Sequence, residues 1–447
     1  MATPINYYDG LNQKLYNALP KNAHKVLELG CANGYLGKLY KEVNPNSTWW
    51  GLDLSAQALE TASQHLDQVF AIDLDCDSLT TIEKGFDLIV IGDLLEHLKN
   101  PEKVLDALYD LATQDAKIVC CLPNMAHLSV LERILGGDFS YDDMGLLDKT
   151  HVRFYSPGSA FKIFLDSGWL PHLQDSYHTD LPQTPFVSKI IEAANMLGVP
   201  AMTAQRNLCT YQMIIVCVKW PAKKNAEMNS YSPFSVIVPV NRKWELDLNI
   251  ARSPGLREVG AEIICVTGAD NAASAFASGA QRATNSWRVM VHQDVYFPPG
   301  SGFALAKKLG ELEKSANTSV PIGFAGMDIA SDGSARYSGM VIDRTALFWH
   351  EGSTRAISLD EFAIVLHKDC LVKPDPILGW HTWGTDLCLQ LLQLSGQPKA
   401  QILEIPLFHN SLNPGSLPPE FMKSAELLLA KYPNMEKINT LCGVLGR

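Results

Sequence analysis

The sequence lacks several features that would place it in a specialised class of protein. None of its ten cysteines forms a CxxC pair, so neither a zinc site nor a disulfide framework is expected. No apolar run approaches the roughly 20 residues that a helix needs to cross a bilayer. The opening stretch, MATPINYYDGLNQK, has no charged start followed by an apolar core, so no signal peptide is predicted. We therefore expect a cytoplasmic protein without stable membrane insertion.

The chain also lacks an excess of basic residues. Its formal net charge is −11 at pH 7, and neither half is basic. Binding a phosphate backbone requires clustered lysine and arginine, so nucleic acid is not expected as a substrate. The acidity is most simply that of a solvated surface. With 447 residues, the chain is long enough for two or three domains.

Apolar runs typical of buried strands alternate with helical patterns from Lys25 onward. The strand-like runs are KVLEL, TWWGLDL, QVFAIDL, FDLIVIGD and AKIVCCLP. This alternation predicts an α/β fold with a parallel sheet and helices on both of its faces. Two further apolar runs, near 168–175 and 209–219, are predicted to complete the sheet.

A polar segment divides the chain. Residues 221–233, PAKKNAEMNSYSP, lack apolar periodicity and are flanked by prolines, which is typical of a linker. Strand-like runs then resume with PFSVIVPV, EIICVTG and WRVMVHQD. The sequence therefore predicts a first domain over 1–220, a linker over 221–232 and a second α/β domain over 233–447.

The first strand of the first domain runs into a glycine turn, VLELGCANGYLG at 26–37. Glu28 precedes the turn, and Asp53 ends the next strand. The glycine spacing, GxxxG, differs from the GxGxxG that binds a dinucleotide. Two acids around such a turn suit a ligand with a cationic amino-acid end and a ribose diol. An ordinary strand-to-helix turn is the alternative.

This turn resembles the ExGxGxG motif of class I S-adenosylmethionine-dependent methyltransferases of the type 11 and 12 kind, with alanine in place of the middle glycine. The resemblance implies a Rossmann-like fold in which an acid contacts the methionine amine, a second contacts the ribose and a third reaches adenine. Asp73 and Asp93 end the third and fourth strands, where either can alternatively cap a helix. The residues assigned to cofactor binding are Glu28, Gly30, Ala32, Gly34, Asp53, Asp73 and Asp93.

Two further stretches resemble small-molecule methyltransferases. GDLLEHLKNP, at 92–101, resembles an xxLEHLxxP stretch that would place Glu96 and His97 beside the methyl group. Histidine can act as a base because its pKa lies near working pH. A packing or capping role for His97 is an equal alternative.

Residues 122–156 resemble the LPN…H and GLLDxTHxRFF stretches of methyltransferases commonly encoded beside sugar-assembly enzymes. His127 and His151 are the candidate catalytic residues, and Asp148 and Arg153 are candidates for acceptor binding. A structural ion pair between Asp148 and Arg153 is the alternative.

The second domain resembles GT-A glycosyltransferases of family 2, of the subgroup first recognised in streptomycin biosynthesis. PFSVIVPV, the stretch 271–300 and LFHNSLNP carry the resemblance. In this family an Asp-x-Asp holds a divalent cation against the nucleotide-sugar diphosphate. Here His292 and Asp294 occupy those positions, and His409 would be the third ligand of Mn²⁺ or Mg²⁺.

The same resemblance assigns a catalytic base and donor contacts. Asp386, in GWHTWGTDLCLQ, matches the family's base, although it can also be a helix N-cap. Asp270 would contact the uracil or ribose of the donor. Trp380 and Trp383 would stack on a sugar, or else pack in the core.

Together these features predict a bifunctional enzyme of glycan or glycosylated-metabolite biosynthesis. It would methylate a sugar hydroxyl and add a sugar, with inversion, from a nucleotide-sugar donor to a glycan or glycosylated small molecule. The alternative is a methyltransferase whose second domain is degenerate and only binds carbohydrate or a partner. A lipid or protein acceptor is a third possibility, and the lack of an amphipathic membrane helix disfavours lipid.

Overall fold

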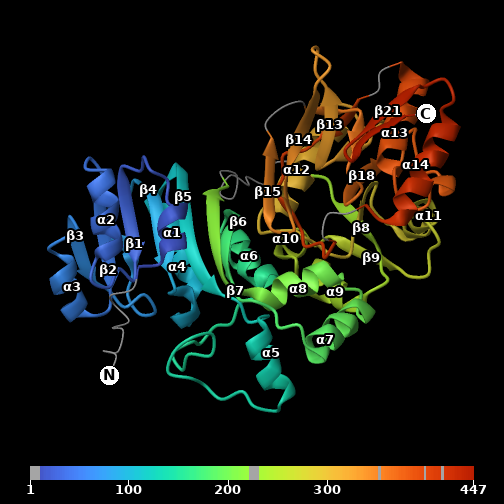
Figure 1. Cartoon of the computed structure of the whole chain (residues 1–447). Coiled ribbons are helices and arrows are strands. Elements are labelled where there is room, and N and C mark those ends of the chain that lie inside the picture. The colour runs from blue at the N-terminus through green and yellow to red at the C-terminus, as the bar shows by residue number, and fades with distance from the viewer. Residues whose placement is uncertain (1–10, 221–230, 351–353, 397–398, 414–416, 447) are drawn as a thin grey trace. The chain divides into compact units, whose positions relative to one another are not determined.

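The computed structural model describes residues 11–220, 231–350, 354–396, 399–413 and 417–446 (Figure 1). It divides into two compact units. The first comprises Met1–Pro221 with Leu412–Pro414, and the second comprises Ala222–Ser411 with Gly415–Arg447. Most of the predicted linker, residues 221–230, lies outside the described residues. No helix among the residues described has the length and apolar character to cross a bilayer.

The first unit is built on a sheet with the strand order β3-β2-β1-β4-β5-β7-β6. Its strands are β1 (Lys25–Leu29), β2 (Thr48–Asp53), β3 (Gln68–Ala71), β4 (Phe86–Gly92), β5 (Ala112–Pro123), β6 (Trp169–His178) and β7 (Thr210–Lys219). Neighbours from β3 to β5 are parallel, whereas β7 is antiparallel to both β5 and β6. The predicted parallel sheet is confirmed, and the two late apolar runs do complete it.

The helices of this unit are α1 (Gln13–Ala18), α2 (Tyr35–Val43), α3 (Ala56–Ala62), α4 (Pro101–Leu111), α5 (Leu128–Leu135), α6 (Pro157–Asp166), α7 (Pro185–Met196) and α8 (Ala201–Cys209). Helices α1, α2, α3, α4 and α6 lie along the sheet, whereas α5 and α7 lie off it and share a small apolar cluster with α8 (Figure 1). Successive side chains of a strand point to opposite faces, and all four residues of 88–91 in β4 are fully buried. Residues of α1, α2 and α3 share one apolar core with one face of β1, β4 and β5.

The second unit is also mixed α/β. Its main sheet has the order β16-β19-β12-β18-β10-β8-β9, and a further sheet has the order β11-β20-β14-β13-β17, with β15 paired to β14. The strands are β8 (Phe234–Pro239), β9 (Glu262–Val266), β10 (Trp287–Val291), β11 (Val295–Tyr296), β12 (Ile322–Gly323), β13 (Ala325–Ile329), β14 (Ala335–Asp343), β15 (Ala346–His350), β16 (Arg355–Ala356), β17 (Ser358–Leu359), β18 (Ala363–His367), β19 (Ala400–Ile402), β20 (Leu407–His409), β21 (Lys437–Thr440) and β22 (Gly443–Gly446).

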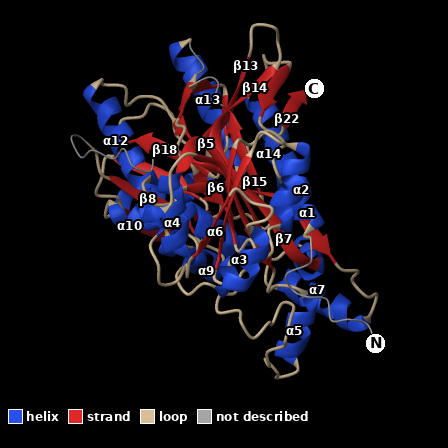
Figure 2. Ribbon diagram, turned by 90° about the vertical axis from the view of Figure 1, so that its left-hand side faces the viewer, coloured by secondary structure: helices blue, strands red, loops and turns tan. Residues whose placement is uncertain are grey.

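Parallel pairing in this unit joins β9 to β8 and β8 to β10, and β18 is antiparallel to β10. The helices are α9 (Lys243–Leu248), α10 (Pro254–Glu258), α11 (Ala272–Arg282), α12 (Ser301–Lys314), α13 (Trp383–Ser395) and α14 (Pro419–Lys431) (Figure 2). The small residues of α11 allow close packing on β8. A Cβ at Gly279 would lie 2.3 Å from Ile237 Cγ2.

Candidate functional site

The glycine turn after β1 has an unusual backbone. Gly30, Ala32 and Gly34 all have positive φ, of 70°, 47° and 75°. A left-handed conformation costs an alanine about 1 kcal/mol, which glycine avoids. At Ala32 the backbone N–H donates to Asp53 Oδ2 at 2.9 Å, which helps to hold the turn. The turn therefore ties the end of β1 to the end of β2.

Glu28 lies beneath this turn and is almost entirely buried. Its Oε2 accepts a hydrogen bond from Trp49 Nε1 at 2.8 Å, and its exposed fraction is 6%. Burial raises the pKa of Glu28 from 4.5 to about 8, against the opposing effect of the Trp49 bond. A cationic group that reached this carboxyl would favour its ionised form.

Asp53 ends β2, and Asp73 lies two residues after the end of the neighbouring strand β3. Both oxygens of Asp53 accept backbone N–H groups, since Oδ1 also accepts from Ser55 at 2.8 Å. Each carboxylate oxygen can accept a second bond, which leaves Asp53 able to bind a diol. Asp73 accepts from the Asp75 N–H at 3.0 Å and does not line the cavity described next.

A cavity of about 300 Å³ opens at the carboxyl ends of β1 and β4. Its lining includes Gly30 and Ala32 of the turn, so backbone is open to a ligand there. Four carboxyl groups line it, together with one histidine: Glu28, Asp93, Glu96, Asp148 and His151. Among the described residues that line it, there is no lysine or arginine. The cavity therefore suits a ligand that carries positive charge.

Asp93 enters the cavity from the end of β4 with a positive φ of 47°. Gln212 Nε2 donates to its Oδ1 at 2.6 Å. Burial raises the pKa of Asp93, although hydrogen bonds from Cys121 and Asn12 act in the opposite direction. Asp93 directly follows β4 and lines the cavity, and its contact with cofactor stays a prediction.

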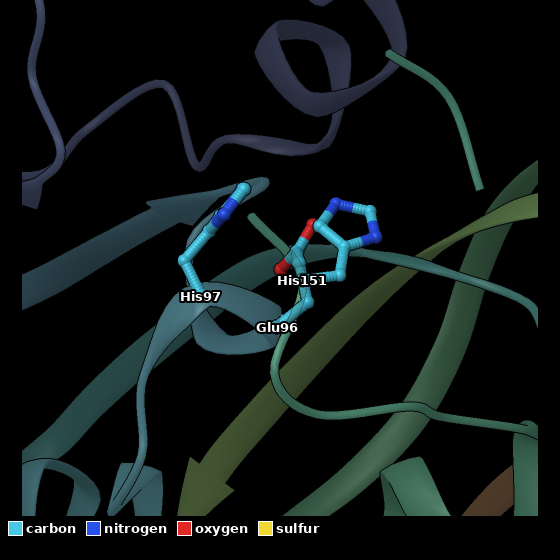
Figure 3. A group of neighbouring side chains, drawn as sticks. All are labelled: Glu96, His97 and His151. Carbon is cyan, nitrogen blue, oxygen red and sulfur yellow. The ribbon is translucent and has the colours of Figure 1, made fainter. Parts of the chain in front are cut away.

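Glu96, His97 and His151 lie together beside this cavity, although 53 residues separate the two histidines of the group in sequence order (Figure 3). Glu96 and His97 belong to a short helical turn after β4, and His151 comes from the loop after α5. The imidazole rings of His97 and His151 meet edge to face, with centroids 4.8 Å apart. Burial lowers the pKa of His97, and the neighbouring His151 lowers it further.

The structure separates two other predicted residues from this group. His127 is the N-cap of α5, where its Nδ1 accepts from the Ser129 N–H and its Nε2 lies 2.7 Å from Thr179 Oγ1. It does not line the cavity, and its catalytic role stays a prediction. Both of its nitrogens serve local structure.

Arg153 is also placed away from an acceptor site. Its guanidinium donates to the Lys99 carbonyl oxygen, through Nε at 3.1 Å, rather than pairing with Asp148. Asp148 instead accepts from Thr150, and it lines the cavity. The alternative of an Asp148–Arg153 ion pair was therefore wrong, and Arg153 fixes the loop through a backbone contact.

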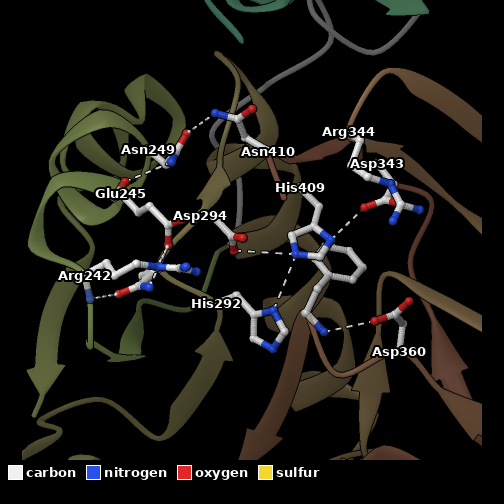
Figure 4. Close-up of polar contacts among 12 residues, drawn as sticks. Arg242, Glu245, Asn249, His292, Asp294, Asp343, Arg344, Asp360, His409 and Asn410 are labelled. Carbon is white, nitrogen blue, oxygen red and sulfur yellow. Dashed lines mark hydrogen bonds and ion pairs between the residues drawn. The ribbon is translucent and has the colours of Figure 1, made fainter. Parts of the chain in front are cut away.

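In the second unit, His292, Asp294 and His409 do come together, as predicted (Figure 4). One possible ligand atom of each lies within 4.8 Å of those of the other two. His409 Nε2 is 3.5 Å from Asp294 Oδ1 and 3.4 Å from His292 Nδ1. These donor atoms can hold a transition-type divalent ion.

Asp343, at the end of β14, was not predicted as part of this group. Its Oδ1 lies 2.9 Å from His409 Nδ1, so His409 stands between two carboxylates. Burial alone would lower the pKa of His409, but Asp294 and Asp343 raise it to about 10. No motif marks Asp343, because pairing between β14 and β20 brings it to the site.

A cavity of about 480 Å³ adjoins this group. His292 and Asp294 line it, as do Trp380 and Trp383. Trp380 is part exposed and can stack on a ligand, whereas Trp383 is also buried in the apolar core. Asp270 is exposed and is not part of the lining, although Gly268 and Ala269 are.

The carboxyl group of Asp386 is enclosed within the second unit, away from its candidate site. Its side chain is 0% exposed, and it accepts bonds from Tyr432 at 2.7 Å, from Lys431 at 2.9 Å and from Gln390 at 2.6 Å. It lines neither cavity described above. These contacts join α13 to α14, and the predicted role of Asp386 as catalytic base stays a prediction.

Comparisons with known proteins match the first unit to methyltransferases. A family model described as a methyltransferase domain matches residues 27–118. The ubiquinone biosynthesis O-methyltransferase of Psychrobacter arcticus is 28% identical over 155 residues, which cover 32% of this chain and 58% of that protein. The protein of the same name from Glaesserella parasuis is 26% identical, over 26% of this chain and 52% of that protein. The chain thus spans just over half the length of these relatives.

Solved structures are similar over a larger share of the chain, at lower identity. A SAM-dependent methyltransferase from Archaeoglobus fulgidus is 19% identical with a TM-score of 0.33, covering 46% of this chain and 90% of that one. An O-methyltransferase of a Brevibacillus brevis polyketide synthase, in complex with S-adenosyl-L-homocysteine, is 13% identical with a TM-score of 0.31, covering 47% and 71%. On the family match and the geometry of its glycine turn, the first unit contains a class I S-adenosylmethionine-dependent methyltransferase domain.

Proposed function

We propose that the first unit transfers a methyl group from S-adenosylmethionine to an oxygen atom of an acceptor. The observation that carries this proposal is the cavity in which the glycine turn and Glu28 face the same space as Glu96 and His151. The relatives described above are named O-methyltransferases, which supports oxygen as the accepting atom.

The residues of the turn fit the cofactor. Glu28 would accept the methionine ammonium, and the carboxylate of Asp53 would accept the ribose hydroxyls. Gly30 and Ala32 offer open backbone to the methionine moiety, since both line the cavity. Gly34 starts α2 and keeps the turn tight. Asp93 lines the same cavity, and Asp73 would reach adenine from outside the cavity lining.

The chemistry is an in-line displacement. The acceptor hydroxyl gives up its proton, its oxygen forms a bond to the methyl carbon, and the bond from that carbon to sulfur breaks. Sulfur keeps the electron pair, which yields S-adenosylhomocysteine. Positioning of the two reactants supplies much of the acceleration. His151 lines the cavity and His97 lies against it, so either imidazole can take the proton.

We infer that the acceptor is a sugar hydroxyl, in a glycan or a glycosylated small molecule. The support is the likeness of residues 122–156 to methyltransferases encoded beside sugar-assembly enzymes, together with the second unit. Mass spectrometry of glycans from cells with and without the gene tests this, since loss of the gene should remove a methyl increment. Unchanged glycan masses would contradict a sugar acceptor.

Cofactor binding can be tested apart from the acceptor. Calorimetric titration of the full chain with S-adenosylhomocysteine should give one site. Glu28→Gln and Asp53→Asn should each weaken it, by about 10-fold for the loss of one charge-assisted hydrogen bond. Exposed His24, at the other end of the sheet, provides a control in His24→Ala. Binding unaffected by both acid variants would overturn the assignment of the turn.

We further propose that the second unit is a GT-A-like glycosyltransferase that uses a nucleotide-sugar donor and a divalent cation, with inversion. The support is the cluster of His292, Asp294 and His409 at the edge of a 480 Å³ cavity with two tryptophans. When bound, Mn²⁺ or Mg²⁺ would offset charge on the leaving diphosphate.

The alternative is a degenerate unit that only binds carbohydrate or a partner, since His292 stands where the family has an acid. Hydrolysis of UDP-sugars with added Mn²⁺ distinguishes the two. Activity that His292→Ala and Asp294→Asn both abolish would support a transferase. Binding of sugars without turnover of any nucleotide sugar would favour the alternative.

A further inference from the structure

We propose that Glu96, His97 and His151 form a divalent-cation site in the methyltransferase unit, suited to a first-row transition ion such as Zn²⁺, Mn²⁺ or Co²⁺. One possible ligand atom of each residue lies within 4.8 Å of those of the other two. Figure 3 shows the three side chains turned toward one another from two separate segments. Two imidazoles and one carboxylate are ligands that such ions accept, with coordination positions left open.

The Glu96 carboxylate gives independent support. This side chain is 1% exposed, and its Oε2 has no hydrogen-bond partner among the residues that the structure describes. A buried polar atom without a partner costs about 1–3 kcal/mol, and more when it is charged. Because Glu96 lines the cavity, a cation bound beside it could satisfy this oxygen.

The hydrogen bonds of His97 and His151 engage Nδ1 of each ring and leave Nε2 available to bind a metal. Thr150 Oγ1 donates to Asp148 Oδ1 at 2.6 Å, so toward His97 Nδ1, at 3.0 Å, this oxygen acts as the acceptor. His97 therefore carries its proton on Nδ1 and presents the lone pair of Nε2. The Nδ1 of His151 lies 3.1 Å from the Leu146 carbonyl oxygen, which can only accept. In both rings, Nδ1 thus has a hydrogen-bond acceptor of the kind that orients histidine ligands of metals.

The surrounding charge also favours a cation. Asp93 and Asp148 line the same cavity as Glu96, and no described lining residue supplies a positive charge. Metal–ligand bonds of about 2.1 Å would place the ligand atoms about 3.4 Å apart in a tetrahedral site. The separations between the ligand atoms, now up to 4.8 Å, would therefore have to shorten by up to about 1.4 Å, which small side-chain rotations can provide.

The role of the ion rests on the proposed methyl transfer. A cation held beside the cavity would bind the acceptor oxygen in one of its open positions and lower the pKa of that hydroxyl. With the ion bound, the free lone pairs of both imidazoles would be coordinated, so the hydroxyl proton would pass to water rather than to His97 or His151. The oxygen would then attack the methyl carbon as described above. The acceptor class is accordingly a molecule with a hydroxyl group that can coordinate a metal.

The test must exclude the second candidate cluster in this chain. The full chain carrying His292→Ala and His409→Ala, freed of metal, should bind one Co²⁺ with visible absorption bands of a coordinated ion. In that background, Glu96→Gln, His97→Ala and His151→Ala should each weaken Co²⁺ binding at least about 10-fold, and Thr150→Val should weaken it about 10-fold. His24→Ala is the matched histidine control and should change nothing. No bound Co²⁺, or equal binding by all variants, would overturn the proposal.

Cofactor binding, measured in the same samples, separates this proposal from the proposed function. If His151→Ala loses Co²⁺ but still binds S-adenosylhomocysteine, the cation site is supported. If the background protein binds Co²⁺ but no S-adenosylhomocysteine, the cation site stands and methyl transfer fails. If methyl transfer to any acceptor, for example a cationic amine, persists in the presence of a chelator, the acidic cavity serves something other than a metal. That result would overturn the proposed cation site.

Discussion

Trp49 Nε1 donates a hydrogen bond to Glu28 Oε2 at 2.8 Å, inside the core of the methyltransferase unit. This contact joins β2 to the carboxyl group that we assign to the methionine ammonium. It also fixes the orientation of a group that burial keeps protonated near neutral pH, because the pKa of Glu28 is about 8. Binding of a cationic ligand is therefore linked to loss of a proton.

We predict that S-adenosylhomocysteine binding releases a proton from Glu28 near pH 7. Calorimetry in buffers of different ionisation enthalpy measures this release, and affinity should rise between pH 6.5 and 8.5, values that lie within about 1.5 units of the folded pKa. Glu28→Gln should abolish the contribution of this group. An equal proton release in Glu28→Gln would show that another group is responsible.

The same carboxyl group should affect stability with a defined sign. Its pKa in the folded chain, about 8, lies above the ordinary value of 4.5, so at intermediate pH the unfolded state holds fewer protons. Stability should therefore fall as pH rises from 4.5 to about 8, by about 1.4 kcal/mol per unit, and then level off. Urea unfolding of wild type and Glu28→Gln across this range measures the difference. A wild-type stability curve parallel to that of Glu28→Gln would contradict the prediction.

Ala32 should tolerate glycine and reject a branched side chain. Ala32→Gly relieves a positive φ but adds chain entropy, so the free energy of unfolding should change by less than about 1 kcal/mol. Ala32→Val should destabilise the turn and weaken S-adenosylhomocysteine binding at least about 10-fold, since β-branched residues rarely adopt positive φ. Thermal unfolding and calorimetry measure both effects. Normal binding by Ala32→Val would show that the turn adjusts.

His127→Ala and His151→Ala should separate stability from turnover. Loss of the N-cap at His127 should lower the stability of the first unit by about 1 kcal/mol and leave turnover close to that of wild type. His151→Ala should cut turnover by about 100-fold or more, because it removes a group that faces the cavity. Initial rates and thermal unfolding of both variants test this. A large loss of turnover in folded His127→Ala would restore it as a catalytic candidate.

Asp386 should prove structural. Asp386→Ala leaves Lys431 and Tyr432 without this buried partner and should destabilise the second unit by about 3 kcal/mol. Asp386→Asn, which keeps a hydrogen-bond acceptor, should lose less. Urea unfolding followed by tryptophan fluorescence measures both. If Asp386→Asn is as stable as wild type but loses transfer from a nucleotide sugar, Asp386 would be catalytic after all.

Short sequence motifs predicted those site residues that lie at the end of a strand or in the loop directly after it. The glycine turn, the acids at strand ends and the His292–Asp294 pair all follow directly from a strand and its loop. Their positions could be predicted because the carboxyl ends of parallel strands meet at one edge of a sheet. The local contacts of His127 and Asp386 were not predicted, because a polar residue in a motif looks the same in sequence whether it caps a helix, joins two helices or faces a ligand.

The sequence by itself determined the alternation of strands and helices, the order of the first sheet's strands along the chain and the glycine turn with its two acids. Only the tertiary structure decided which side chains meet. It brought His151 to Glu96 and His97, placed Asp343 against His409, and enclosed Asp386 between α13 and α14. The reason is physical: hydrophobic periodicity is a short-range property, whereas contacts between distant segments depend on how whole elements pack.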